Sequence, residues 1–457
     1  MTALAEPTRE IPLKRAISRN WLLLLVVGDV LGAGIYALVG EVAGRVGGAI
    51  WTAFAVAITL ATFTAFAYAE LVTKYPRAAG AALYVNKAWR QPLFTFLVTF
   101  TVMCSGLTSA ATLSRAFGGD YLSVFLEVPT ILAALIFIVL VALVNFRGIA
   151  ESVRLNVVLT SIELTGLLLV VIVGLAAIGA AGASIDAGNV LDFKEGEAVV
   201  FAILGGAGLA FFALLGFEDS VNLAEEVEDP SRNYPRALFG GLIIAGAIYL
   251  VVTVVASIVV PTDQLAGSSG PLLEVVQVGP LSLPTELFSA IALFALANGA
   301  LINMIVASRL LYGMSRERIL LPALGRVHPR TQTPWVAIVA TTALAMVLIA
   351  SGDLSELADT TVLLLLLVFT AVNIAVLVLR RDPVAHSHFR APTVIPVLGA
   401  VASVALMTTK DADVFARAGG LILLGLVLWG VNWWLHGRHV DPYGTGELEA
   451  VERRPLK

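Results

Sequence analysis

Long apolar segments recur along almost the whole chain and are separated by short polar stretches. An α-helix rises about 1.5 Å per residue, so about 20 apolar residues are enough to cross the hydrocarbon core of a bilayer. Segments of this length predict spanning helices centred on residues 20–42, 48–72, 93–117, 130–146, 155–179, 199–223, 237–260, 284–311, 334–351, 360–379, 393–409 and 414–436. The chain is therefore predicted to be an all-α polytopic membrane protein with about 12 transmembrane helices.

Two of these segments are interrupted by glycine inside the apolar run. In the first segment, Val27–Tyr36, Gly32 and Gly34 flank a single alanine, and in the sixth several glycines interrupt the stretch Leu204–Glu218. Glycine weakens a helix by roughly 1 kcal/mol relative to alanine, and an opened backbone persists in a bilayer only where it is buried in protein or lines a cavity. Two interrupted segments in corresponding positions are the best sequence indication of a transporter's substrate site.

The positions of the two breaks also predict an internal repeat. If spans 1–5 are repeated by spans 6–10, the breaks open the first span of each half, and the odd number of spans makes the second half run upside down. The alternative is that the glycines only permit close helix packing, because Gly28, Gly32 and Gly40 are spaced at multiples of four. We favour broken helices because Gly32 and Gly34 are too close in sequence to share one helix face.

The basic residues are sorted between the two sides of the predicted membrane. All but five of the 29 lysines and arginines fall on one side, and the exceptions are Arg45, Arg115, Lys194, Lys410 and Arg417. Since cytoplasmic loops are rich in basic residues, both termini are predicted to be cytoplasmic and the chain to lie in the inner, cytoplasmic membrane. The predicted parts are a tail over 1–18, repeats over 19–180 and 198–380, two further spans within 391–436, and a tail over 437–457.

Composition excludes several other classes of protein. Hydrophobic residues make up 58% of the chain and charged residues 14%, which leaves no room for a soluble domain of useful size. Membrane lipid is the expected surrounding, and nothing in the charge pattern indicates a nucleic-acid partner. The one cysteine, Cys104, excludes an intrachain disulfide, and the pair His386 and His388 is too sparse for a metal site. No catalytic or cofactor motif is present, so no enzyme activity, catalytic residue, cofactor or metal is predicted.

A broken helix suits one type of ligand. The opened segment leaves free N–H groups at the start of one half-helix, which attract an anion, and free carbonyls at the end of the other, which attract a cation. A zwitterion can satisfy both ends at once. The breaks therefore predict a free amino acid as the substrate.

Four motifs in order make the chain resemble a known family. They are Gly32–Gly40, Tyr68–Leu71 with Pro76–Gly80, Ala224–Arg236, and Ser308–Arg316 followed by His328–Pro334. With these motifs the chain resembles the amino acid–polyamine–organocation superfamily along nearly its full length, most closely its cationic amino acid transporter branch and the bacterial relatives of that branch. The resemblance implies a LeuT-like core, a five-plus-five inverted repeat with broken helices 1 and 6, and two extra helices.

The resemblance also implies a substrate site. The substrate carboxylate is expected on the backbone amides of Gly32, Ala33 and Gly34. The ammonium group is expected on the backbone carbonyls of Val30, Phe212, Ala213 and Leu215. Phe212 occupies the position of an aromatic gate that closes over the substrate from outside, although ordinary core packing is the alternative for this residue.

Glu163 is the main departure from the family pattern. Family members that couple to protons often have a lysine midway along span 5, where this chain has an acid. An acid inside a membrane is a functional-site hypothesis by default, and burial favours its neutral form, as a reversible proton carrier requires. One alternative is a permanently protonated acid bonded to a backbone carbonyl or to Asn156. Another is an ionised acid that helps to hold a sodium ion between spans 1, 5 and 8.

Two further acids lie beside the predicted breaks. Asp29 is expected either to pair with Glu163 or to face a watery vestibule, and Glu218 either to act as a gate or to be exposed to the cytoplasm. The favoured function is proton-coupled amino acid symport by alternating access, with exchange as the nearest alternative and a non-transporting amino acid receptor as a third. Small or medium neutral amino acids are slightly favoured over cationic ones, because span 3 offers no acid. Sodium as the coupling ion and the oligomeric state stay open.

Overall fold

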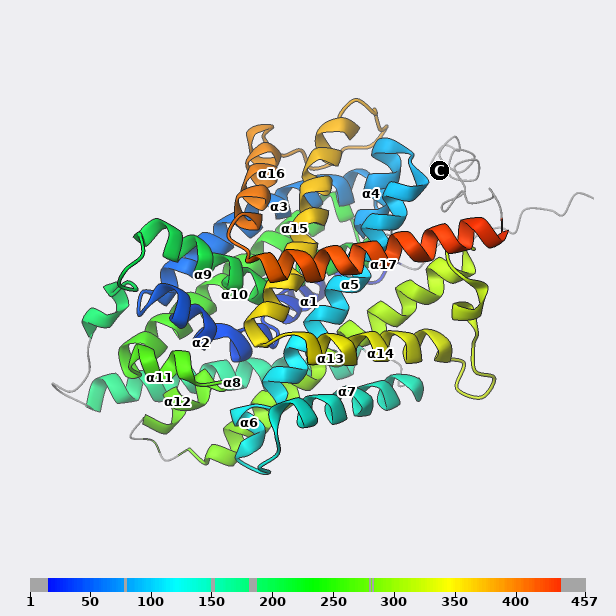
Figure 1. The fold of residues 1–457 in the computed structure, drawn as a ribbon. Helices are drawn as coiled ribbons and strands as arrows, with labels where there is room; N and C mark the ends of the chain where they lie inside the picture. Colours follow the sequence, from blue (N-terminus) through cyan, green and yellow to red (C-terminus); the bar gives the residue numbers. More distant parts are fainter. Residues whose placement is uncertain are drawn as a thin grey trace, which may run out of the picture.

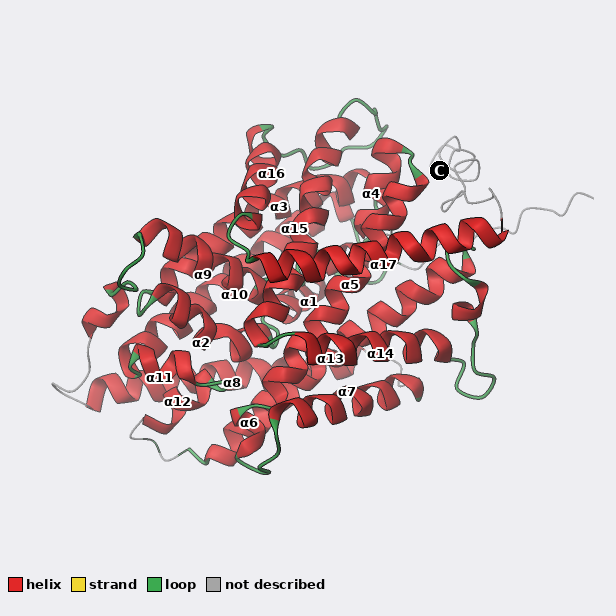
Figure 2. Cartoon of the chain, viewed as in Figure 1, coloured by secondary structure: helices red, strands yellow, loops and turns green. Residues whose placement is uncertain are grey.

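The computed structural model describes residues 15–77, 80–148, 153–180, 187–278, 281 and 283–436. Most of both predicted tails, 1–14 and 437–457, lies outside these residues. The described part is built from helices and contains no β-strand, only one isolated bridge between Ile17 and Val227 (Figure 2). The expected all-α class is confirmed.

The helices follow one another along the chain as labelled in Figure 1. The α-helices are α1 (Arg19–Val30), α2 (Gly34–Val46), α3 (Ile50–Lys74), α4 (Gly80–Trp89), α5 (Pro92–Phe117), α6 (Asp120–Ser123), α7 (Thr130–Phe146), α8 (Val153–Ala180), α9 (Val199–Ala213), α10 (Pro230–Val259), α11 (Thr262–Gly267), α12 (Pro271–Val278), α13 (Thr285–Arg316), α14 (Trp335–Ser351), α15 (Leu354–Leu379), α16 (Val394–Met407) and α17 (Ala412–His436). Short 3₁₀ helices are η2 (Ala187–Leu191), η3 (Asp219–Leu223) and η4 (Pro322–Gly325).

Every apolar segment predicted from the sequence falls on a helix. Among the described residues, seven helices are long and apolar enough to span a membrane, namely α3, α5, α8, α10, α13, α15 and α17. Taken together, α1 and α2 are also long and apolar enough and are bent by 44° at the break between them, and α7, α9, α14 and α16 are shorter apolar helices. Large apolar side chains such as Leu140, Phe294 and Trp434 are more than half exposed, as expected for a surface that contacts lipid. The protein is a multi-pass membrane protein.

The first predicted break is present where the sequence places it. α1 ends at Val30 and α2 begins at Gly34, and the intervening residues are not helical. The end of the bundle at which α1 begins is called the α1 side below, and the end at which α2 ends is called the α2 side.

The second break lies inside the predicted segment Leu204–Glu218, at its later end. α9 continues through Gly206 and Gly208 and ends at Ala213, after which a turn with Gly216 at φ +119° leads into η3. The first glycines of the segment therefore do not open the helix. These glycines allow close packing instead, because a Cβ on Gly206 would lie only 2.1 Å from Val46 Cγ2.

The broken helices lie in the middle of the bundle. α1 packs against α10, and α2 and α3 pack against α9, while α5 packs against α13 and α15 on the other side of the breaks. α16 and α17, the two helices beyond the predicted repeats, pack on α15, α3 and α5 (Figure 1). The breaks are therefore enclosed by helices that are long enough to hold them at membrane depth.

Candidate functional site

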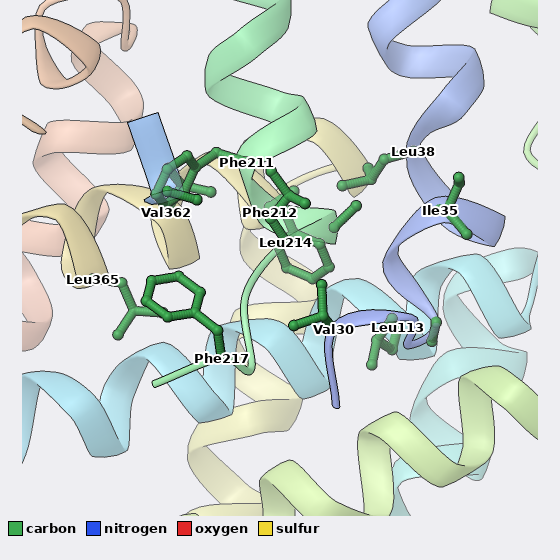
Figure 3. Packing of buried hydrophobic residues seen from close by; sticks show 14 of the residues in the cluster. Val30, Ile35, Leu38, Leu113, Phe211, Phe212, Leu214, Phe217, Val362 and Leu365 are labelled. Atoms are coloured by element: carbon green, nitrogen blue, oxygen red, sulfur yellow. The ribbon is translucent and has the colours of Figure 1, made fainter. Parts of the chain in front are cut away.

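A cavity of about 210 Å³ lies at the two breaks. Six of the seven residues predicted to bind substrate line it, and these are Gly32, Ala33, Gly34, Phe212, Ala213 and Leu215. The seventh, Val30, ends α1 beside them, and Figure 3 shows Val30 close to Phe212. The structure thus brings residues from opposite halves of the sequence to one place, as the inverted repeat predicts.

The cavity extends toward the α1 side. Its lining includes Gly80 at the start of α4, Val221 in η3 and Leu310 near the end of α13. Toward the α2 side lie Phe212 at the end of α9, Leu38 one turn into α2 and Val362 in α15, the last two fully buried (Figure 3). These apolar residues separate the cavity from the α2 side.

Tyr249 in α10 joins the ends of the two broken helices, and the sequence prediction missed it. Its hydroxyl contacts the carbonyl oxygen of Val30, at the end of α1, and that of Ala213, at the end of α9, the latter at 3.0 Å. A hydroxyl carries one proton and therefore donates to only one of these carbonyls at a time. Two of the carbonyls predicted to receive an ammonium group thus share one protein donor. A tyrosine inside an apolar span needs a hydrogen-bond partner, and that requirement was the available signal.

The start of α2 closes against the end of α9. A Cβ on Gly34 would lie 2.7 Å from the Cα of Ala213, whereas a Cβ on Gly32 would meet only the carbonyl oxygen of Asp29, at 3.3 Å. Gly34 is therefore required for the close approach of the two broken helices, and Gly32 is not. The positive end of the α2 helix dipole points into the cavity at this position.

Glu163 lies in the wall of the same cavity, and its side chain is buried. Its Oε1 accepts a hydrogen bond from Asn298 Nδ2 in α13 at 3.2 Å, and its backbone carbonyl accepts one from the Tyr36 hydroxyl at 2.6 Å. Asn298 was not singled out from the sequence. The side chain of Asn156, the partner considered there, lies outside the described side chains. Glu163 therefore connects α8 to α13 and α2 at the site.

The other predicted acids line the cavity as well. Asp29 contributes to its wall, and its carbonyl oxygen packs against Gly216, where a Cβ would lie 2.6 Å away. Glu218 accepts a hydrogen bond from the Gly216 amide at 3.0 Å, so it caps the turn that follows α9. Asp219 lines the cavity beside Glu218. The charged side chains that line the described cavity are all acidic.

Comparison with known proteins identifies the family. The profile described as amino acid permease matches residues 20–419. The chain belongs to this family. It is therefore an amino acid transporter of the amino acid–polyamine–organocation superfamily, as the motifs imply.

Two relatives illustrate the range within the family. The branched-chain amino acid permease BcaP of Bacillus subtilis is 25% identical over 450 residues, which cover 93% of this chain and 94% of the relative. The vacuolar cationic amino acid transporter 4 of Arabidopsis thaliana is 30% identical over 393 residues, 81% of this chain and 64% of the relative. One relative is named as a permease and the other as a transporter, in agreement with the prediction that the chain is not an enzyme.

Proposed function

We propose that the chain is a proton-coupled amino acid symporter that binds its substrate between the two helix breaks. The observation that carries this proposal is the cavity in which the start of α2 faces the end of α9. The amides of Gly32, Ala33 and Gly34 receive the substrate carboxylate. The carbonyls of Val30, Phe212, Ala213 and Leu215 receive its ammonium group.

The proposed orientation places the α1 side in the cytoplasm and the chain in the cytoplasmic membrane. The cavity then opens inward, and α1–α8 and α9–α15 form the two inverted repeats. Phe212 closes over the substrate from the external side. Alternating access moves the opening from one side of this site to the other.

Glu163 is the proposed proton carrier. It is buried and it lines the cavity beside Asn298, so its protonation can respond to whichever side the cavity faces. Asp29 and Glu218 are proposed as coupling or gating acids, because they line the path from the substrate site toward the α1 side.

Small or medium neutral amino acids are the proposed substrates. The wall close to the breaks is formed by Phe212, Ala213 and Leu215, which offer apolar contacts to a side chain. The names of the relatives include both branched-chain and cationic amino acids. A panel that contains both classes therefore decides between them.

The test is uptake of a panel of labelled amino acids into proteoliposomes with an imposed inward proton gradient, with and without sodium. Accumulation that needs only the proton gradient supports symport. Uptake that requires preloading with amino acid indicates an exchanger, and binding without any uptake indicates a receptor. A requirement for sodium would identify the other coupling ion.

Glu163→Gln tests the carrier directly. The amide cannot release a proton, so gradient-driven accumulation is expected to fall to the level seen without a gradient, while exchange continues. Glu286→Gln is the matched control, because Glu286 is an exposed acid in the first turn of α13, away from the cavity. Unchanged pH dependence of uptake in Glu163→Gln would falsify the carrier role.

A further inference from the structure

The α2 side of the protein carries a network of ion pairs and hydrogen bonds that involves all five basic residues predicted on that side. Arg45 lies 3.4 Å from Asp411, and Arg417 lies 2.8 Å from Glu356. Backbone carbonyls accept from the other two exposed or half-buried bases, Arg115 and Lys194. Lys410 differs from these four because it is buried.

Lys410 lies in the linker between α16 and α17, and its side chain points into the bundle. Its Nζ forms an ion pair with Asp359 near the start of α15. Only 1% of the Lys410 side chain and 5% of the Asp359 side chain are exposed. Arg45, at the end of α2, lies 3.9 Å from the other carboxylate oxygen of Asp359. One buried carboxylate therefore joins α15, α2 and the linker.

The same lysine also lies directly on α9. A Cβ on Gly208 would be 2.6 Å from Lys410 Nζ and 3.1 Å from Thr409 Oγ1. Gly208 precedes Phe212 by one helical turn, and Asp359 precedes Val362 by about one turn. The lysine thus sits one turn outside the apolar residues that separate the cavity from the α2 side.

We propose that residues 408–411 form a latch that holds the α2 side closed, with Lys410 as the part that engages α9 and α15. This proposal rests on the proposed alternating access. α2, α9 and α15 together close the cavity on this side, so opening it has to separate them. Opening then breaks the contact of Lys410 with Asp359 or with α9. The two helices outside the repeats thereby acquire a role in transport.

An ion pair suits such a contact better than an apolar one. Burying two charges costs much of what their attraction returns, and water restores their solvation when they separate. The paired and the hydrated states are therefore closer in free energy than the two states of an apolar contact of the same size. A latch has to be closed in one conformation, and the free-energy cost of opening it for the other has to be small.

The test measures how fast the α2 side opens, and it needs no substrate. The reporter is Val362→Cys, made in a Cys104→Ala background because Cys104 is a buried free cysteine. A membrane-impermeant maleimide is added to right-side-out and to inverted vesicles, and the labelling rate from each side is measured. Lys410→Met removes the charge and keeps an unbranched side chain that is one atom shorter.

We expect Lys410→Met to raise labelling from the α2 side about tenfold or more, as loss of a charged hydrogen bond from the closed state implies. Gly208→Ala leaves the charges in place and displaces the end of the lysine and the Thr409 hydroxyl, both within residues 408–411, so it tests the latch even if Lys410→Met fails to fold. Its control is Gly205→Ala in the same helix, where a Cβ meets nothing within 4 Å. Lys194→Met controls for loss of a surface charge on this side.

Faster labelling in Gly208→Ala than in Gly205→Ala, with Lys194→Met unchanged, supports the latch, and faster labelling in a folded Lys410→Met assigns the effect to the lysine charge. Equal rates in Gly208→Ala and Gly205→Ala overturn it, as does an equal effect of Lys194→Met. Because labelling is measured without substrate, these outcomes are separate from the result of the uptake experiment.

Discussion

Replacing Gly34 with alanine tests whether the substrate lies between the two helix breaks. The added Cβ would lie 2.7 Å from the Cα of Ala213 and 3.2 Å from Phe212 Cδ1. Carbon atoms in contact prefer about 3.5–4.0 Å, so the start of α2 and the end of α9 have to separate by roughly 1 Å. The nearest atom belongs to the backbone, and therefore no side-chain rotation relieves the clash.

The size of the effect follows from the cost of overpacking. Forcing an extra carbon into a packed site typically costs about 1–3 kcal/mol, by straining the backbone or by moving the helices apart. A bound amino acid needs the amides of α2 and the carbonyls of α9 at a fixed separation. If the strain is relieved by widening the site, binding weakens by about 5- to 150-fold, since about 1.4 kcal/mol corresponds to a factor of ten.

Gly32→Ala is the matched control, because the same substitution there is accommodated. The nearest atom to its added Cβ is the Asp29 carbonyl oxygen at 3.3 Å, and the backbone angles of both glycines are ones that alanine can adopt. We expect Gly32→Ala to change affinity less than about threefold, in keeping with a small clash. Equilibrium binding of labelled substrate to purified protein measures both variants, and melting temperatures without substrate report any loss of folding.

Two results would refute this reasoning. If Gly34→Ala binds substrate as the unchanged protein does, the substrate does not need the close approach of α2 and α9. If Gly32→Ala loses as much affinity as Gly34→Ala, the loss reflects a general sensitivity of the segment and not the contact with Ala213.

Two further predictions concern buried polar groups. Tyr249→Phe removes the hydroxyl shared by two helix-end carbonyls, which lowers the stability of the substrate-free protein by about 1–3 kcal/mol. We expect the variant to bind amino acid more tightly and to show a larger substrate-induced rise in melting temperature. Weaker binding would instead show that the hydroxyl contacts the substrate. Glu70→Ala leaves Arg380 buried without its bidentate partner, so we expect a loss of about 3–5 kcal/mol in stability, measured by thermal unfolding in detergent. Asp411→Ala breaks the exposed pair with Arg45, at 3.4 Å, and should cost less than about 1 kcal/mol, and equal losses in the two variants would contradict the role of burial.

The spans were predictable because hydrophobic length is a local property of the sequence. A helix of a given length either crosses the bilayer or does not, whatever it packs against. α7 illustrates this, since the apolar run over 130–146 coincides with Thr130–Phe146. The first break was predictable for the same reason, because Gly32 and Gly34 weaken the helix locally.

The position of the second break within Leu204–Glu218 did not follow from its glycines, because a glycine either opens a helix or admits a close neighbour and only packing separates the two. Gly206 and Gly208 remain helical because Val46 and Lys410 fill the space that a Cβ would occupy. A glycine that opens a helix and a glycine that admits a neighbour have the same sequence signature. The neighbours come from α2 and from the linker after α16, more than 150 residues away in each case.

Tyr249 and Asn298 were missed for a related reason. Each is a polar residue in an apolar span, and this much can be read from the sequence. Neither a motif nor the spacing identifies its hydrogen-bond partner. The partners are the carbonyls of Val30 and Ala213 for the tyrosine and the Glu163 carboxylate for the asparagine. A polar residue at membrane depth therefore predicts that a partner exists, and the fold decides which one it is.

The scarcity of basic residues on the α2 side is a feature of the sequence that draws attention to Lys410. If this side is external, lysine and arginine are disfavoured there, so each one that is present calls for a specific reason. Four of the five satisfy surface or half-buried carbonyls and acids, and Lys410 alone has its charge buried against α9 and α15. An external base that is also buried goes against the charge bias of the membrane and carries the free-energy cost of desolvation. A contact that opens and closes during transport explains why a lysine is both external and buried at this position.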